Sequence, residues 1–217
     1  MSTTKTAVTA HSGAMGLADN SIKAMRAGVA AGADIVEFDL SFNAAGEPVL
    51  SHDEPRGGEA TLADAYAFLR ENPRVRANID LKQLTERLPV VEALAEEYGV
   101  LDRVFFTGIV EDWIPEVRRL CPKIPYYLNY SVDEDRMHEE AYASELAERA
   151  EKLGALGLNV HHSGASAVLA QKLHDRGLEL SVWTVNEPEE IRRMLALGAD
   201  NITSRRPDAA RGERDKY

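Results

Sequence analysis

Two predicted strands carry polar residues at alternate positions. Glu37 and Asp39 lie within IVEFDLSF, and Asn78, Asp80 and Lys82 repeat the spacing within NIDLK. Alternate residues of a strand share one face, so the two strands would point three carboxylates, an amide and an ammonium at one volume. Carboxylates buried together repel strongly unless a cation lies among them. Mg²⁺ and Ca²⁺ take oxygen ligands, so we predict a divalent metal site at Glu37, Asp39 and Asp80; a structural network of ion pairs is the alternative.

Two histidines follow predicted strands and could transfer protons. His11 ends the first strand, and His52 follows a short strand within PVLSHDEP. Imidazole titrates near neutral pH, as general acid–base chemistry requires. Each histidine alone is more typical of a core hydrogen bond or a surface turn, but together with the carboxylates they indicate a catalytic pair. His161 and His162 are adjacent, so at most one can face the same site, and we expect rim or structural roles for both.

The positions of these residues imply an α/β fold. Short β-like runs alternate with helical runs along the whole chain, which favours parallel strands joined by helices. Eight such units favour a TIM-type (β/α)₈ barrel as a single domain over residues 1–217, with a short hairpin insertion after the second strand and a polar, frayed tail from residue 207. The carboxyl ends of the strands would then meet at one face. The predicted strands span residues 6–11, 35–42, 76–82, 104–109, 124–130, 156–161, 179–185 and 201–204.

The composition limits the partners. The chain has 217 residues, of which 44% are apolar and 28% charged, and a formal net charge of −11. Such a surface repels nucleic acid and anionic lipid, so neither is expected as a partner. Cys121 is the only cysteine, and the sequence has neither a signal-peptide pattern nor the run of about 20 apolar residues that spans a membrane. We therefore expect a cytoplasmic protein that acts on a small molecule without stable membrane insertion; the sequence leaves the oligomeric state open.

Taken in order, these motifs resemble the glycerophosphodiester phosphodiesterase family, part of the phospholipase-C-like phosphodiesterase superfamily. The shared segments are AHSG, GADIVEFDLSF, PVLSHDEP, NIDLK, SVWTVNEPEEIRRMLALGAD and NITSRRPD, which span nearly the whole chain. The resemblance implies a barrel with a divalent metal held by the three carboxylates already named. It also implies catalytic roles for His11 and His52, and phosphate binding by Lys82.

The chain departs from the family pattern at several places. Ser12 stands where the family usually has a phosphate-binding Arg, and Asp80 stands where it usually has Glu. The usual P-E-N-T segment reads A-D-N-S here, which keeps Asn20, a residue that we expect to bind substrate. The insertion between Asp53 and Thr61 is far shorter than in typical members, so the chain resembles a compact member with an open mouth.

The missing Arg removes a bidentate phosphate contact, worth roughly 1.5–3 kcal/mol as a charge-assisted hydrogen bond. Arg205 and Arg206 follow the last predicted strand, which would lie beside the first strand in a closed barrel. We expect Arg205 to bind phosphate in place of the missing side chain. The alternative is that both arginines are surface charges.

The resemblance predicts metal-dependent hydrolysis of glycerophosphodiesters to glycerol 3-phosphate and an alcohol. The metal would act as a Lewis acid, and the two histidines as general acid and base. Trp183, Asn186, Tyr127 and Asn129 would line the mouth and contact the alcohol, although packing is an equal alternative for Trp183 and Tyr127. The rival functions are a phospholipase-D-like lyase that forms a cyclic phosphate and a catalytically degenerate barrel that binds phosphate. A metal-dependent aldolase or isomerase lacks a matching motif.

Overall fold

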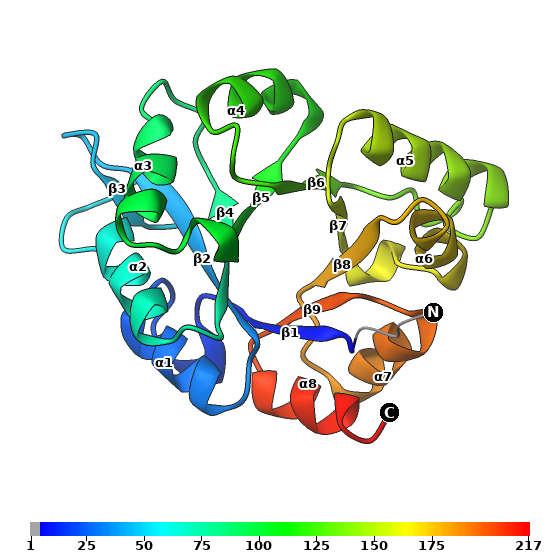
Figure 1. Cartoon of the computed structure of the whole chain (residues 1–217). Coiled ribbons are helices and arrows are strands. Elements are labelled where there is room, and N and C mark those ends of the chain that lie inside the picture. Colours follow the sequence, from blue (N-terminus) through cyan, green and yellow to red (C-terminus); the bar gives the residue numbers. More distant parts are fainter. Residues whose placement is uncertain (1–4) are drawn as a thin grey trace.

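The computed structural model describes residues 5–217, which form a barrel of parallel strands surrounded by helices (Figure 1). This arrangement confirms the predicted TIM-type (β/α)₈ barrel. The strands are β1 (Ala7–Ala10), β2 (Ile35–Phe42), β3 (Pro48–Leu50), β4 (Arg76–Leu81), β5 (Val104–Ile109), β6 (Tyr126–Tyr130), β7 (Gly157–His161), β8 (Glu179–Trp183) and β9 (Asn201–Ser204). The helices are α1 (Ile22–Ala30), α2 (Leu62–Glu71), α3 (Pro89–Glu97), α4 (Ile114–Leu120), α5 (Glu140–Lys152), α6 (Ala167–His174), α7 (Pro188–Leu197) and α8 (Pro207–Arg214).

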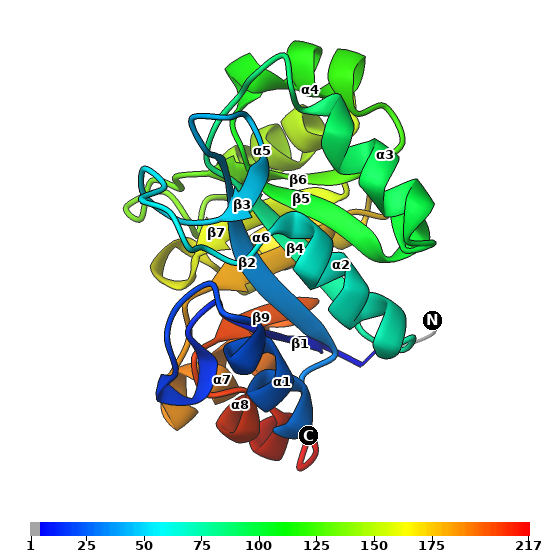
Figure 2. The same cartoon turned by 90° about the vertical axis from the view of Figure 1, so that its left-hand side faces the viewer.

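The sheet closes because β1 pairs in parallel with both β2 and β9. β3 is the one antiparallel addition in the described chain, and it pairs with the end of β2 through Leu40 and Leu50. Figure 2 shows β3 beside the extended end of β2, at one side of the barrel. The predicted hairpin insertion is therefore present. Among residues 5–217, no helix combines the length and apolar content that crossing a bilayer needs.

The inward faces of the strands form an apolar floor with polar side chains above it. Ile35, Phe105 and Tyr127 make a buried cluster at this floor. Because inward-facing residues recur at every second position, the next inward residues are Glu37 on β2 and Asn129 on β6. Two roles were left open for Tyr127, lining of the mouth and packing, and the structure shows packing: its side chain belongs to the floor, and its hydroxyl contacts the Glu179 carboxylate.

The outward faces of the strands are covered by helices, so the strands are buried on both sides. All eight residues of β2 are buried, including the outward-facing Phe38 and Leu40. A parallel strand that packs against helices on its outer face and against side chains on its inner face is expected to be mostly apolar. Acidic residues on the inner face of β2 are therefore tolerated only where other polar side chains surround them.

The segment after β9 is ordered, which corrects the prediction of a frayed tail. Residues 207–214 form α8, with Pro207 in its first turn and Ala210 buried. Pro is favoured at the first helical position because its fixed φ suits a helix and its missing N–H is not needed there. Arg214 then donates to the backbone oxygen of Thr6 at 3.1 Å and pairs with Asp34. The polar composition of this segment did not predict an ordered helix, because charged side chains make many of the contacts that hold α8 to the barrel.

Candidate active site

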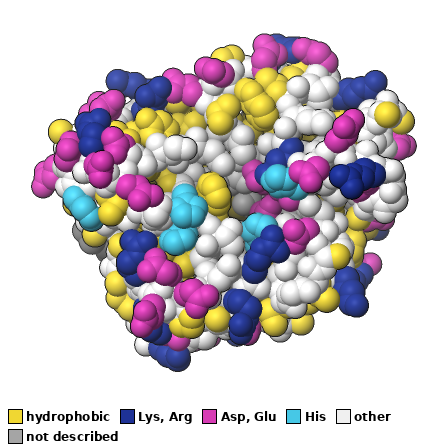
Figure 3. All heavy atoms as spheres, turned by 180° about the vertical axis from the view of Figure 1, so that it is seen from behind, with side chains coloured by type: hydrophobic (Ala, Val, Ile, Leu, Met, Phe, Trp, Pro, Cys, Tyr) yellow, Lys and Arg dark blue, Asp and Glu magenta, His cyan; other side chains and the backbone are white. Residues whose placement is uncertain are grey.

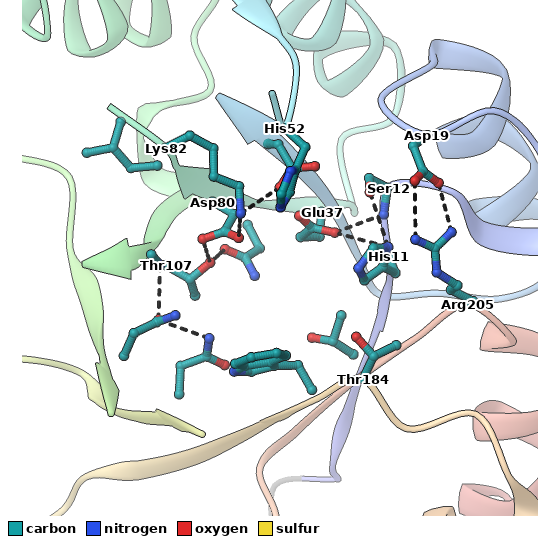
Figure 4. A pocket seen from close by; sticks show the side chains of 18 residues that line it. His11, Ser12, Asp19, Glu37, His52, Asp80, Lys82, Thr107, Thr184 and Arg205 are labelled. Carbon is teal, nitrogen blue, oxygen red and sulfur yellow. Dashed lines mark hydrogen bonds and ion pairs between the residues drawn. The ribbon is translucent and has the colours of Figure 1, made fainter. Parts of the chain in front are cut away.

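A cavity of about 590 Å³ opens at the carboxyl ends of the strands. Figure 3 shows a hollow on this face with histidine, acidic and basic side chains around it. Most of the residues predicted for the site line the cavity, and Figure 4 shows their arrangement. The predicted residues that line it are His11, Glu37, Asp39, His52, Asn78, Asp80, Lys82, Asn129, Trp183 and Arg205; Asn20 does not.

The three carboxylates converge because their strands are neighbours in register. Asp39 pairs with Asp80 across β2 and β4, and Glu37 lies two residues earlier on the same face of β2. One oxygen from each carboxylate lies within 4.8 Å of the others. Burial, followed by repulsion from Asp39 and Asp80, raises the pKa of Glu37 well above its usual value. Burial is also the largest cause of the raised pKa of Asp80. This cluster therefore favours a positive charge among its oxygens.

Lys82 supplies one positive charge to the cluster. Its Nζ lies 2.6 Å from Asp80 Oδ2 and 2.9 Å from Asp39 Oδ1. Burial alone would lower the pKa of Lys82, but its interactions with Asp80 and then Asp39 outweigh that effect and raise it. The lysine is thus a firmly held cation just after the carboxyl end of β4. Its single charge does not balance three carboxylates.

The remaining negative charge fits a divalent cation. Glu37, Asp39 and Asp80 offer carboxylate oxygens of the kind that Mg²⁺ and Ca²⁺ bind. The cavity leaves this cluster accessible to a ligand and to water. The donor set therefore suits a hard divalent cation better than Zn²⁺, which favours nitrogen and sulfur ligands.

His11 lies beside the carboxylate cluster at the end of β1. Its Nδ1 is 3.8 Å from Glu37 Oε2 and 3.1 Å from Ser12 Oγ. The backbone N–H of Ser12 donates to Glu37 Oε2 at 2.8 Å, so the residue in place of the usual Arg helps to fix Glu37. Burial and then the nearby Arg205 charge lower the pKa of His11, so its imidazole favours the neutral form. A neutral imidazole can accept a proton.

His52 reaches the same cavity from the loop after β3. Its side chain is largely exposed, and Nδ1 lies 2.9 Å from Asp53 Oδ1. Figure 4 shows His52 above the space between Asp80 and Glu37, and His11 beside Glu37. Two imidazoles in these positions can address different oxygens of one bound group, as an acid and a base must.

Asn20 does not line the cavity but holds one of the carboxylates from behind. Its Nδ2 donates to Asp39 Oδ2 at 2.8 Å, and its Oδ1 accepts from the Asp39 backbone N–H at 2.9 Å. Both ends of the amide are therefore engaged with Asp39. The residue has a φ of +57°, a conformation that Asn adopts more readily than most residues. In place of the predicted substrate contact, the structure gives Asn20 a positioning contact.

Arg205 lies at the rim, where the loop after β9 meets the loop after β1. Its Nη1 and Nη2 contact the Asp19 carboxylate at 2.7 and 3.2 Å. Arg206 points elsewhere and pairs with Asp208. Asn186, which was expected to contact substrate, does not line the cavity; its Oδ1 accepts from the Arg205 backbone N–H at 2.9 Å. Of the two arginines considered, Arg205 is the one at the cavity.

The mouth is completed by aromatic and polar side chains from later strands. Trp183 on β8 is 38% exposed and lines the cavity, and the ring of His161 lies edge-on to it. His161 and His162 lie outside the cavity lining, in agreement with rim positions. The lining also includes small polar residues that we did not single out: Thr107, Asn159, Thr184 and Thr203. Their signal was weak because single Thr and Asn residues near strand ends are common.

A parallel barrel whose mouth combines buried carboxylates, a lysine and two histidines falls within the class of α/β-barrel phosphodiesterases. The chain belongs to the Glycerophosphoryl diester phosphodiesterase family, whose sequence profile matches residues 10–64 and 56–209. Members of this family are phosphoric diester hydrolases. This chain is also 26% identical to a Glycerophosphodiester phosphodiesterase of Caldanaerobacter subterraneus subsp. tengcongensis, over 94% of this chain and 96% of that protein.

Solved structures share the fold. A glycerophosphodiester phosphodiesterase from Parabacteroides distasonis superposes with a TM-score of 0.76 at 22% identity, covering 98% of each chain. A phosphodiesterase from Oleispira antarctica, solved in complex with the product sn-glycerol-3-phosphate, gives a TM-score of 0.77 at 20% identity over 96% of each chain. At these identities the likeness establishes the architecture.

Proposed function

We propose that the protein is a divalent-metal-dependent phosphodiesterase that hydrolyses glycerophosphodiesters to glycerol 3-phosphate and an alcohol. The observation that carries the proposal is the convergence of Glu37, Asp39 and Asp80 with His11 beside them. Family membership supports the reaction class, and the product bound to the Oleispira antarctica relative supports a glycerol-based substrate. Mg²⁺ or Ca²⁺ is the proposed ion because all three proposed ligands are carboxylates.

The residues of the chain divide the chemistry among themselves. Glu37, Asp39 and Asp80 would hold the cation, which when bound supplies Lewis-acid stabilisation of charge on a phosphoryl oxygen. Lys82 and Arg205 add positive charge around the phosphate. His11 and His52 share two tasks, removal of a proton from the nucleophile and delivery of a proton to the leaving alcohol oxygen. Trp183 forms an apolar wall for the organic part of the substrate.

A panel of diesters tests the proposal. Glycerophosphocholine, glycerophosphoethanolamine and a bis-aryl phosphate would be incubated with Mg²⁺, Ca²⁺, Mn²⁺ or a chelator, and the released alcohol measured. We expect turnover of the glycerol diesters with at least one metal and none with chelator. Asp39→Asn should abolish turnover, whereas Asn43→Asp, an opposite exchange outside the cavity lining, should not. Absence of turnover with every metal would instead support a degenerate phosphate-binding barrel.

Phosphorus NMR of the products separates hydrolysis from transfer within the substrate. A hydrolase accumulates glycerol 3-phosphate as its final product. Accumulation of a cyclic phosphate that the enzyme does not open would overturn the hydrolase assignment in favour of a lyase.

A further inference from the structure

A continuous chain of hydrogen-bonded side chains runs around the inside of the barrel and reaches the lining of the cavity at Asn159 and Asn129. It begins at Thr9 on β1 and passes through β9, β8 and β7 to Asn129 on β6. The successive donor–acceptor contacts are Thr9 Oγ1 to Asn201 Oδ1 at 2.7 Å, Asn201 Nδ2 to Ser181 Oγ at 2.9 Å, Ser181 Oγ to Asn159 Oδ1 at 2.8 Å, and Asn159 Nδ2 to Asn129 Oδ1 at 3.0 Å. The first four residues are buried, and Asn129 is half-buried.

The direction of this chain is fixed at one end by the backbone. The Gly108 N–H on β5 donates to Asn129 Oδ1 at 3.0 Å, and a backbone N–H can only donate. The oxygen of the Asn129 amide must therefore face Gly108, where it also accepts from Asn159. Each following contact takes its polarity from the previous one, because an amide that donates from its nitrogen presents its oxygen to the next partner. The orientation of the Asn129 amide is thus determined by the network.

This orientation leaves the nitrogen of Asn129 free for a ligand. Asn129 lines the cavity, and its Nδ2 makes no hydrogen bond to any residue between 5 and 217. An amide nitrogen carries two N–H donors and no acceptor. The chain of side chains therefore presents an uncharged pair of donors to whatever occupies the cavity.

Asn129 is also close to the carboxylate cluster. Gly108, which fixes its oxygen, has a φ of +75°, and a Cβ built there would lie 2.4 Å from Asp80 Oδ1. β5 thus passes directly against Asp80, and its register to β6 is irregular between Phe106 and Ile109. Because Asn129 is bonded to Gly108, its amide lies near the carboxylates that would hold the cation, and therefore near the place where a phosphate bound to that cation would lie.

We propose that Asn129 binds a phosphoryl oxygen of the substrate through its amide N–H groups, and that Asn159 and Ser181 are positioning residues that hold it. The proposal rests on the phosphodiesterase function proposed above and assigns Asn129 to the phosphate in place of the alcohol. Lys82 and Arg205 share their hydrogen bonds with carboxylates, since Lys82 bonds to Asp39 and Asp80 and Arg205 bonds to Asp19, whereas the Asn129 nitrogen has no such partner among residues 5–217. An uncommitted donor at Asn129 adds a phosphate contact in a chain with Ser12 in place of the usual Arg.

The test measures binding of inorganic phosphate and of sn-glycerol 3-phosphate by calorimetry, together with their inhibition constants, on the metal-loaded protein. Asn129→Ala removes the donors, and we expect both ligands to bind roughly ten- to a hundredfold more weakly, as for loss of one hydrogen bond to a charged acceptor. Asn129→Asp places an anionic oxygen at the same position and should weaken binding further. The matched control is Gln171→Glu, the same exchange on the outer helix α6, which should leave both affinities unchanged. Asn129→Ser replaces Asn129→Ala if the latter does not fold.

The positioning residues have a separate readout. Ser181 does not line the cavity, so Ser181→Ala can weaken phosphate binding only by removing the hydrogen bond that orients Asn159 and, through it, Asn129. We expect a higher KM and weaker phosphate binding with kcat little changed, and recovery in Ser181→Thr, which restores the hydroxyl. If Ser181→Ala and Ser181→Thr weaken phosphate binding equally, or if only kcat falls, the positioning role is overturned.

The outcomes also distinguish this proposal from the proposed function. Normal turnover with unchanged phosphate affinity in the Asn129 variants overturns the role of Asn129 and leaves the phosphodiesterase intact. Weaker binding of sn-glycerol 3-phosphate with unchanged affinity for inorganic phosphate would mean that the amide contacts a glycerol hydroxyl. That result would also overturn the phosphate contact of Asn129. Absence of turnover in the unaltered protein, with phosphate binding weakened by Asn129→Ala, rejects the enzyme activity and supports the binding role.

Discussion

Arg205 Nη1 lies 2.7 Å from Asp19 Oδ1, so the loop that leaves β9 is tied to the loop that leaves β1 at the rim of the cavity. The two residues are 186 positions apart in the sequence. Their contact places a guanidinium beside His11 and the carboxylate cluster, within the part of the chain that the phosphate would approach. It also makes the arginine a candidate for the missing phosphate contact.

Removal of Arg205 should weaken substrate binding. An arginine-to-phosphate hydrogen bond is worth roughly 1.5–3 kcal/mol, so Arg205→Ala should raise KM about tenfold or more in steady-state assays. Arg206→Ala is the matched control, because Arg206 pairs with Asp208 outside the cavity lining and should leave KM unchanged. If KM and kcat are unaltered in both variants, Arg205 does not replace the missing side chain.

Each of the two histidines proposed as acid and base should be essential for turnover without being needed for metal binding. His11→Ala and His52→Ala should each lower kcat by about 10²–10⁴, the usual contribution of a positioned acid or base. Calorimetry should show that both variants still bind the divalent cation, because the three carboxylates remain. His138→Ala, an exposed histidine outside the cavity lining, serves as control. Near-normal rates in either variant would contradict the two-histidine scheme.

Lys82 should oppose metal binding while assisting catalysis. Its Nζ contacts Asp39 and Asp80, both proposed ligands, so its charge repels an incoming cation. Lys82→Gln should therefore bind the divalent metal roughly tenfold more tightly, since unit charges a few ångströms apart interact by several kcal/mol at intermediate dielectric. The same variant should lose turnover. Lys123→Gln, on the surface, should change neither value, and weaker metal binding in Lys82→Gln would refute the competition.

The ordered tail should contribute to stability through Arg214. Its side chain is only 9% exposed, pairs with Asp34 and donates to the Thr6 backbone oxygen. Arg214→Ala removes the donor to the half-buried Thr6 oxygen and the ion-pair partner of the exposed Asp34, and should lower the free energy of unfolding by about 1 kcal/mol in urea titrations. Lys216→Ala, an exposed neighbour, is the control. Equal unfolding midpoints for the two variants would show that α8 is held by its apolar contacts alone.

Cys121 should be unreactive in the folded protein. Burial, and then the nearby Glu92 charge, raises the pKa of its thiol to about 12. Since the thiolate is the reactive form, an aromatic disulfide reagent should modify the native protein slowly at pH 8 and rapidly in urea. A thiol pKa raised by folding stabilises the protein below the unfolded value, and this contribution declines as the pH rises from the ordinary 9.0 toward 12. Cys121→Ser should lose that decline, and fast native labelling would contradict the assignment.

The sequence predicted the carboxylate cluster because the fold translates its spacing directly. Strand residues alternate with a period of two, and parallel neighbours in a barrel bring their carboxyl ends together, so Glu37, Asp39 and Asp80 could be placed on one face before the structure was known. Lys82 lies two residues after Asp80 and follows the same alternation. The spacing of these four residues was enough to predict the cluster, because it depends only on regular strands.

The contacts that the sequence did not predict depend on loops and on distant pairs. Asn20 holds Asp39 only because its backbone adopts a positive φ in an irregular loop, which no periodic pattern reveals. For Tyr127 the sequence left lining of the mouth and packing open, because the alternation gives the face of a residue but not its layer. The polarity of the Asn129 amide comes from partners on several strands, and one residue's type cannot specify it.

The join between β1 and β9 has a consequence for how the chain reaches its native state. Thr9 bonds to Asn201, 192 residues away, and Arg214 bonds to Thr6, 208 residues away. Contacts of such separation form late, because the entropy of closing a long loop must be overcome before they stabilise the fold. During synthesis, β1 can pair with β2 on one edge, but its other edge has no partner until the ribosome has released β9. The rim contact between Arg205 and Asp19 likewise needs the C-terminal residues, so we expect the rim of the cavity to be completed only after β9 has been made.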